Sequence, residues 1–160
     1  MAEERPSMSW SRMSAASKVL LIGSVLLFID LFLPWYKASV GGLSATASGW
    51  HGPLGVLVGI LVIVIIVMEA LILLDMPVNV GTPVMRNQIE AGIALAVLVL
   101  TILHFLLKPS SGFALVHVGW EIWAWIGLIL GIVIGYGGWL RWQEAKVTTP
   151  PPATGGGYAS

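Results

Sequence analysis

The sequence predicts an all-α membrane protein: a bundle of four transmembrane helices with a small β-structured cap formed by the outer loops. Hydrophobic residues make up 57% of the 160 residues and charged residues only 10%, with a mean hydropathy of +0.90. Soluble domains carry roughly 25% charged residues because their surfaces face water. A chain this poor in charge must expose its surface to lipid, and its length suits one compact domain.

Four apolar stretches are long enough to cross a bilayer, whose hydrocarbon core of about 30 Å requires about 20 residues of helix. They cover residues 16–35, 54–74, 89–107 and 120–140. The chain is therefore expected to divide into a cytoplasmic N-terminal tail (1–15), a transmembrane domain (16–146) and a disordered cytoplasmic tail (147–160). That last tail contains consecutive prolines and consecutive glycines, a composition that cannot bury a core.

The basic residues predict the orientation, because cytoplasmic loops and tails carry an excess of Lys and Arg. One side of the predicted bundle has six such residues and the other side has two, Lys37 and Lys108. The six are Arg5, Arg12, Lys18, Arg86, Arg141 and Lys146. We therefore expect a multi-pass protein of the plasma membrane, with both termini in the cytoplasm.

Interfacial aromatic residues give a second indication of the membrane boundaries, because Trp and Tyr prefer the interface. Most of them fall on the side with two basic residues, where we expect an aromatic belt. Its members are Trp35, Trp50, Trp120, Trp123 and Trp125. The aromatic and charge patterns place the boundaries at the same residues.

The first apolar stretch has an alternative interpretation as a cleaved signal peptide. Basic residues precede it, and Ala45-Thr46-Ala47 resembles a cleavage site. However, Asp30 interrupts the apolar stretch, and about ten residues separate Trp35 from that site, whereas signal peptides are cut close to their apolar segment. The spacing favours a retained membrane span.

Small residues predict which helix faces touch, because helices in lipid associate where their backbones can approach closely. Gly127, Gly131 and Gly135 recur at four-residue spacing in the fourth span, and Gly55 and Gly59 do so in the second. The fourth-span stripe fits packing within the bundle or dimerisation between two chains. Small residues serve both arrangements equally.

Three ionisable residues lie within the spans, where a charged group is costly and marks a candidate site. Asp30 and His104 are predicted at similar depths near the outer side, so they could form a hydrogen-bonded pair if their helices are neighbours. Glu69 lies near the inner end of the second span, far from Asp30. Asp30 and Glu69 each fit a structural polar group or a proton- or cation-coupled site. Their dispersal favours the structural role, because a proton relay requires closely spaced groups.

Two further carboxylates, Glu90 and Glu121, stand at predicted helix starts. Unpaired N–H groups and the helix dipole favour a carboxylate at such a position, so we expect both residues to cap their helices. A stripe of small and polar residues continues along the third span from Glu90. It comprises Ala94, Val97, Thr101 and His104. This stripe predicts a helix-contact face of the third helix.

The outer loops are expected to form a small sheet over the end of the bundle. The first loop contains Gly41-Gly42 between β-compatible residues, a pattern typical of a tight hairpin. In the third loop, alternating apolar residues indicate a short strand. They are Phe113, Leu115 and either Val116 or Val118.

The run FIDLFLPWY, followed by a Gly/Ser/Ala-rich loop that closes on SGW, resembles small four-helix membrane proteins of bacteria. The resemblance covers the first span, the first loop and the four-span plan. That family has no established activity, so the resemblance implies only architecture and localisation. A more distant similarity to claudins rests on Trp35 and Gly49-Trp50. The paired cysteines that follow in claudins are missing here, which indicates convergence on a similar plan.

The sequence contains none of the motifs that usually identify an enzyme. There is no cysteine, nucleotide-binding loop, HExxH metal motif or GxSxG elbow, and no second histidine is placed within a span to ligate haem with His104. Eight basic and eight acidic residues balance, so no net field attracts nucleic acid. We expect no enzyme activity, no cofactor and no nucleic-acid partner.

The remaining functional hypothesis is a non-catalytic structural or accessory protein that acts through helix packing and protein–protein contacts. Its partners would be the lipid bilayer and either another membrane protein or further copies of itself. The alternative is a small oligomeric transporter or channel in which Asp30 or Glu69 couples to protons or cations. A third hypothesis, an envelope sensor with the outer loops as receptor, is weakened by the absence of a soluble signalling domain.

Overall fold

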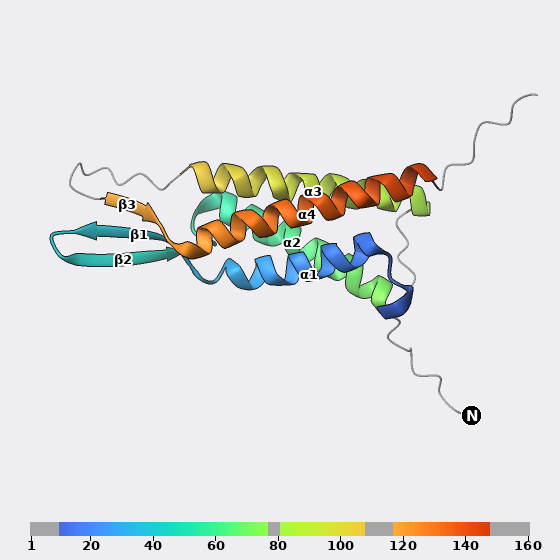
Figure 1. The fold of residues 1–160 in the computed structure, drawn as a ribbon, viewed down its shortest axis with the longest axis horizontal. Coiled ribbons are helices and arrows are strands. Elements are labelled where there is room, and N and C mark those ends of the chain that lie inside the picture. The colour runs from blue at the N-terminus through green and yellow to red at the C-terminus, as the bar shows by residue number, and fades with distance from the viewer. Residues whose placement is uncertain (1–9, 77–80, 108–116, 148–160) are drawn as a thin grey trace, which may run out of the picture.

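Four helices run side by side, and a three-stranded sheet projects from one end of them (Figure 1). The computed structural model describes residues 10–76, 81–107 and 117–147. The helices are α1 (Ala15–Asp30), α2 (Gly52–Leu73), α3 (Pro83–Leu106) and α4 (Ile122–Val147), and a short 3-10 helix, η1 (Trp10–Arg12), precedes α1. The strands are β1 (Pro34–Val40), β2 (Leu43–Ser48) and β3 (His117–Trp120).

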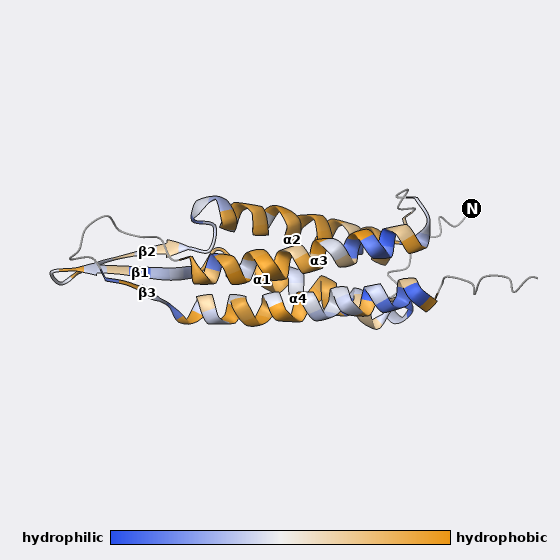
Figure 2. Cartoon of the chain, turned by 90° about the horizontal axis from the view of Figure 1, so that it is seen from above, coloured by the Kyte–Doolittle hydropathy of each residue, from blue (hydrophilic) through white to orange (hydrophobic). Residues whose placement is uncertain are grey.

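Three helices, α2, α3 and α4, are long and apolar enough to cross a membrane. α1 has 16 residues, and a rise of 1.5 Å per residue gives it a length of about 24 Å. The helices are apolar along most of their length, and hydrophilic residues gather toward the end where the described chain begins and ends (Figure 2). We call this the tail end, and the opposite end the sheet end.

The helices differ from the predicted spans at three boundaries. α1 ends at Asp30 and not at Trp35, because Pro34 begins β1 and disfavours a helical backbone at the residue before it. α3 begins earlier than predicted, where Thr82 is the N-cap and its Oγ1 accepts a hydrogen bond from the Met85 N–H at 3.2 Å. α4 continues beyond the predicted end of the fourth span, so Arg141, predicted to follow that span, belongs to the helix.

The four helices form a closed ring in which α1 contacts α2 and α4, and α3 contacts the same two helices. Glycines of α4 allow the close approach of α3. A Cβ atom added to Gly131 would lie 3.0 Å from Thr101 Cγ2, and one added to Gly135 would lie 2.6 Å from Leu98 Cδ2. The stripe in α4 therefore packs against a helix of the same chain.

Two more of the predicted glycines accommodate tryptophan side chains. A Cβ on Gly127 of α4 would overlap the ring of Trp35, and a Cβ on Gly59 of α2 would overlap the ring of Trp50. These glycines serve contacts between helices and the segment that follows α1. The pattern of small residues predicted the contact faces, but it did not predict that aromatic rings would occupy two of them.

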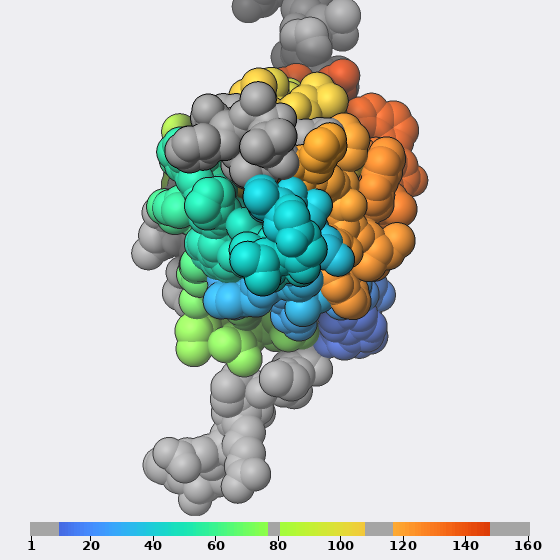
Figure 3. Space-filling model, turned by 90° about the vertical axis from the view of Figure 1, so that its left-hand side faces the viewer, coloured from blue at the N-terminus to red at the C-terminus, as the bar shows by residue number. Residues whose placement is uncertain are grey.

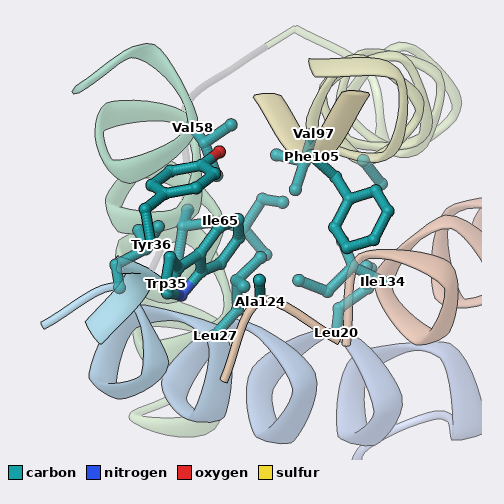
Figure 4. Packing of buried hydrophobic residues seen from close by; sticks show 13 residues of the cluster. Leu20, Leu27, Trp35, Tyr36, Val58, Ile65, Val97, Phe105, Ala124 and Ile134 are labelled. Atoms are coloured by element: carbon teal, nitrogen blue, oxygen red, sulfur yellow. The ribbon is translucent and has the colours of Figure 1, made fainter. Parts of the chain in front are cut away.

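The core contains large side chains from β1. Trp35 and Tyr36 are buried and extend from β1 into the space between the helices (Figure 4). The prediction that Trp35 belongs to an interfacial belt is therefore wrong, because its exposed fraction is 0%. Of the other predicted belt residues, Trp120 and Trp125 are exposed, and Trp50 and Trp123 are partly buried.

The predicted hairpin is present, and its turn explains why two glycines occur together. β1 and β2 pair antiparallel up to Val40 and Leu43, and Gly41 and Gly42 form the turn with φ values of +53° and +87°. Glycine adopts positive φ without the steric penalty of a side chain, and positive φ at both turn residues matches the twist of the strands.

β3 completes the sheet by pairing antiparallel with the other edge of β1, so that the strand order is β2-β1-β3. Tyr36 is opposite Trp120 in this pairing. The predicted β-structured cap is thus confirmed, and β3 includes Val118. Phe113, Leu115 and Val116 lie outside the described residues.

Replacement of Gly127 by alanine tests the packing of β1 into the bundle. We expect Gly127→Ala to lower the free energy of unfolding by about 1–3 kcal/mol, because the added methyl group must displace the Trp35 ring. Gly92→Ala in α3 is the matched control, since a Cβ there meets no atom within 4 Å. It should be neutral or stabilising by up to about 1 kcal/mol. Equal effects of the two substitutions in thermal unfolding of the detergent-solubilised protein would contradict this packing.

Candidate functional site

Two clusters of buried polar groups occupy opposite ends of the bundle. The Arg141 cluster, at the tail end, comprises Arg141, Glu69, Glu90, Glu144, Ser14 and Ser17. The His104 cluster, at the sheet end, comprises Asp30, Trp35, Tyr36, Gly49 and His104. Buried polar groups between apolar helices are costly unless they are bonded, so both clusters are candidate sites for chemistry.

Arg141 of α4 is held by ion pairs to two other helices. Its Nη2 lies 2.5 Å from Glu69 Oε1 on α2, and its Nε donates to Glu90 Oε2 on α3 at 2.7 Å. All three side chains are buried. Hydrogen bonds between ionised partners are stronger than neutral ones, so these contacts fix the relative positions of α2, α3 and α4.

The remaining donors of Arg141 bond to α1 and to α4 itself. Nη2 donates to Ser17 Oγ at 2.7 Å, and Nη1 donates to Ser14 Oγ at 3.3 Å and to Glu144 Oε2 at 3.0 Å. Ser14 is the N-cap of α1 and Ser17 lies in its first turn. A guanidinium group has five N–H donors, and the five bonds of Arg141 use all of them.

The Arg141 cluster corrects two predictions. Glu90 does not cap a helix, because α3 begins at Pro83 and places Glu90 well inside the helix. Glu69 is not an isolated acid, because it shares Arg141 with Glu90. The sequence predicted Arg141 just beyond the fourth span, among the basic residues of the cytoplasmic side, and so its role in the core was missed. The buried face of α4 does continue past the glycine stripe to Gly138 and Arg141, which is the signal that could have revealed it.

Glu121, the other predicted capping residue, stands immediately before α4. Its Oε1 lies 4.0 Å from Lys37 Nζ of β1, and both side chains are partly exposed. Such exposed ion pairs contribute little to stability. Glu121 is therefore near the predicted position but takes no part in either buried cluster.

At the sheet end, Trp35 lies between the two residues predicted to pair. Its Nε1 donates to Asp30 Oδ2 at 3.0 Å and to the Asp30 carbonyl at 3.1 Å. The centre of its ring lies 5.1 Å from that of His104. Asp30 and His104 do occupy the same end of the bundle, as predicted, but Trp35 links them in place of a direct hydrogen bond.

His104 itself is fixed by two backbone contacts. The Tyr36 hydroxyl donates to the His104 carbonyl at 2.5 Å, and the His104 ring is hydrogen-bonded to the backbone of Gly49. Gly55 of α2 leaves room for this arrangement, because a Cβ there would overlap the Gly49 carbonyl oxygen. The cluster thus joins β1, the segment before α2, and α3.

The interior between the two clusters is apolar except for the buried hydroxyl groups of Ser24 and Thr101, which have no hydrogen-bond partner among the described residues. It is filled by Leu20, Leu27, Val62, Ile65, Val97 and Ile134, all with an exposed fraction of 0%. Along α3, Glu90 and His104 are separated by about 21 Å of helix rise, with Thr101 between them. Proton transfer along side chains requires hydrogen bonds of about 3 Å. The described residues form no polar path between the clusters.

A comparison with protein-family profiles, curated proteins and solved structures finds no match to this chain. The resemblance to small bacterial four-helix membrane proteins therefore stays a prediction. Within the described residues, no group of three or more His, Asp or Glu side chains is placed to hold a metal ion.

Replacement of Arg141 should be strongly destabilising, because it leaves Glu69 and Glu90 buried without a counter-charge. We expect Arg141→Met to lower the free energy of unfolding by about 3–5 kcal/mol. Adding Glu69→Gln and Glu90→Gln to this variant should recover part of the loss. The control is Arg86→Met, which removes the same charge at the same end of the bundle from outside the cluster. Denaturation of the reconstituted protein measures the free energy of unfolding of the three variants. An Arg141→Met variant as stable as the original protein would refute the proposed role of the ion pairs.

The burial of the Tyr36 hydroxyl should lower the free energy of unfolding at high pH. This burial raises the pKa of the Tyr36 hydroxyl from 10.0 to about 12. The unfolded chain loses this proton near pH 10 and the folded chain keeps it, so the stabilisation is complete below pH 10. It falls by about 2–3 kcal/mol as the pH rises to 12.

Between pH 9 and pH 12, the free energy of unfolding should therefore decline less in Tyr36→Phe than in the original protein. Tyr136→Phe, which alters an exposed tyrosine of α4, should decline as the original protein does. Identical pH profiles for Tyr36→Phe and the original protein would show that Tyr36 is not responsible for the decline.

Proposed function

We propose that this chain is a four-span integral membrane protein with a non-catalytic, accessory role, which presents its β1–β2 hairpin to a partner protein. The observation that carries the proposal is that the polar groups and small residues inside the bundle are engaged in contacts within the chain. Arg141 has every donor bonded within the chain, and the space beside the α4 glycines is occupied by side chains of the same chain. The middle of the interior is apolar except for the hydroxyl groups of Ser24 and Thr101. Such an interior supports a fixed scaffold.

The surface of α1 supports its assignment as the fourth span. α1 packs between α2 and α4, which are both long enough to cross a membrane. Its outer face exposes large apolar side chains: Ile22, Val25, Leu26, Ile29 and, just after the helix, Phe32. An apolar face of this kind is stable beside lipid and would promote aggregation in water.

The distribution of charge supports an orientation with the tail end in the cytoplasm. Most of the described basic residues lie at or near the tail end, and Lys37 lies at the sheet end. Those nearer the tail end are Arg12, Lys18, Arg86, Arg141 and Lys146. By the excess of cytoplasmic Lys and Arg, the sheet would lie outside the cell membrane. This orientation places both ends of the described chain on the cytoplasmic side.

The hairpin supplies a contact surface for a partner. It extends beyond the helices (Figure 1), and its turn faces outward when the bundle is viewed from the sheet end (Figure 3). Leu43 is 80% exposed at the tip, and β2 forms one edge of the sheet and contains no charged residue or proline. Proteins usually protect such an edge, so β2 is suited to pair with an extended segment of another protein.

A proton- or cation-coupled transporter is the second candidate. It is favoured by one observation: Glu69 Oε2 and Glu90 Oε1 are buried without a hydrogen-bond partner among the described residues. The apolar layer between the clusters argues against a conduction path within one chain. Proton flux in proteoliposomes that disappears in Glu69→Gln would favour the transporter over the accessory role.

The accessory role can be tested with single cysteines, because the chain contains none of its own. Ser44→Cys places a thiol on the exposed edge strand β2, and Gln143→Cys places one on the exposed tail end of α4. In intact cells, a membrane-impermeant maleimide should label only Ser44→Cys. Labelling of Gln143→Cys alone would reverse the proposed orientation.

A photo-crosslinker attached at Ser44→Cys should give a discrete adduct in native membranes, and one attached at Gln143→Cys should not. Adding Leu43→Lys should diminish the adduct, because a charge at the tip opposes strand pairing. An adduct of twice the mass of the chain would identify a second copy as the partner. Recovery of the uncrosslinked chain alone from native membranes would remove the accessory role.

A further inference from the structure

The sheet end of the bundle contains a hollow of about 260 Å³ between the start of α2 and the end of α3. It is lined by His51, Gly52, Pro53, Leu54, His104 and Leu107. Its volume is several times the roughly 30 Å³ that one water molecule occupies in the liquid. The hollow therefore admits a small polar ligand, and its lining indicates the charge of that ligand.

The first indication is the N-terminus of α2, a helix of 22 residues whose first residues line the hollow. The first N–H groups of a helix have no partner within it, and they carry the positive end of the helix dipole. His51 occupies the N-cap position but makes no capping hydrogen bond with its side chain. This helix end therefore favours an anion.

The second indication is independent of the helix and comes from His104. Its side chain lines the hollow and has an exposed fraction of only 4%, and its Nε2 has no hydrogen-bond partner among the described residues. The ring is hydrogen-bonded to the backbone of Gly49, whose own N–H is bonded to Leu33. The bond to His104 therefore runs from Nδ1–H to the Gly49 carbonyl. Nε2 is thus held in a fixed position, and it donates to an oxyanion once it takes up a proton.

The surroundings favour an anion over a cation. No Asp or Glu is among the described residues that line the hollow, and the helix dipole opposes a cation at this position. The titratable groups nearest His104 are Tyr36 on β1 and His51 before α2, with Asp30 of α1 on the far side of Trp35. His51 adds a second imidazole beside the ligand, and Asp30 is occupied by Trp35.

We propose that this hollow binds a phosphate-type oxyanion, held by the N–H groups at the start of α2 and by the protonated His104 side chain. The oxyanion would be either the phosphate of a lipid headgroup or free inorganic phosphate. The apolar side chains of Leu54 and Leu107 beside the hollow are compatible with a lipid. This binding activity is separate from the contact made by the hairpin, and either can fail without the other.

Two ligands distinguish the source of the oxyanion. The purified full-length protein is titrated with inorganic phosphate by calorimetry, and native mass spectrometry measures the retention of phosphatidylglycerol against a phosphate-free glycolipid with the same acyl chains. Retention of phosphatidylglycerol without phosphate binding identifies a lipid headgroup. Binding of inorganic phosphate identifies a site for the free oxyanion. Failure of the original protein to bind either ligand overturns the proposal.

Variants test the two groups that hold the ligand. His104→Gln should weaken binding about tenfold or more, since it removes a charge-assisted hydrogen bond. The matched control is His117→Gln, an exposed histidine of β3 outside the hollow, which should bind as the original protein does. Pro53→Asp should also weaken binding, because a carboxylate at the exposed start of α2 suits the helix and repels an oxyanion.

The pH dependence separates a binding role of His104 from a structural one. Phosphatidylglycerol retention should increase as the pH falls from 8 to 6, because His104 must be protonated and the lipid phosphodiester does not titrate in this range. In a His51→Gln background, which leaves His104 as the histidine of the hollow among the described residues, the increase should remain, and adding His104→Gln should abolish it. If His104→Gln does not fold, the exposed Pro53→Asp variant decides the outcome. Binding by both variants at the original affinity overturns the proposal.

Discussion

Arg141 contacts groups from all four helices, and it does so with every hydrogen-bond donor of its guanidinium group. Arg141 is buried among the helices, where little water is available to replace a lost partner, so an unbonded donor is expensive. A rotation or a shift of any one helix would break at least one of these bonds. The close contacts along α4, in which Gly131 and Gly135 meet α3, require the same helix positions that the Arg141 bonds select.

The sheet is attached to this bundle through its first strand. Trp35 and Tyr36 follow α1 almost directly, and their side chains fill the sheet end of the core and bond to Asp30 and to the His104 carbonyl. Gly127 of α4 provides the space for the Trp35 ring. The hairpin is therefore a continuation of the core, and a partner that binds β2 would meet a surface held in a fixed position relative to the helices.

The sequence predicts what depends on local pattern, and it misses what depends on contacts between distant residues. Apolar stretches located the helices, and Gly41-Gly42 located the hairpin, because hydrophobic length and turn geometry are local properties. The helix ends at Asp30 and Pro83 were displaced because a proline or a capping residue decides them. The meeting of Glu69, Glu90 and Arg141 was not predictable from spacing, since it requires the order of the helices around the ring. For the same reason, the insertion of Trp35 between Asp30 and His104 was not foreseen.

The order in which the ribosome produces these residues would place a demand on any machinery that inserts the helices into a membrane. Glu90 and Glu69 precede Arg141 by 51 and 72 residues. At a synthesis rate of about 5–20 residues per second, several seconds pass before their counter-charge exists. During that interval α2 and α3 carry unpaired acidic groups that a lipid environment disfavours. A nascent chain that inserts into a membrane would therefore depend on a protein or aqueous shelter until α4 arrives, and a chain that stops before α4 would never acquire the Arg141 counter-charge.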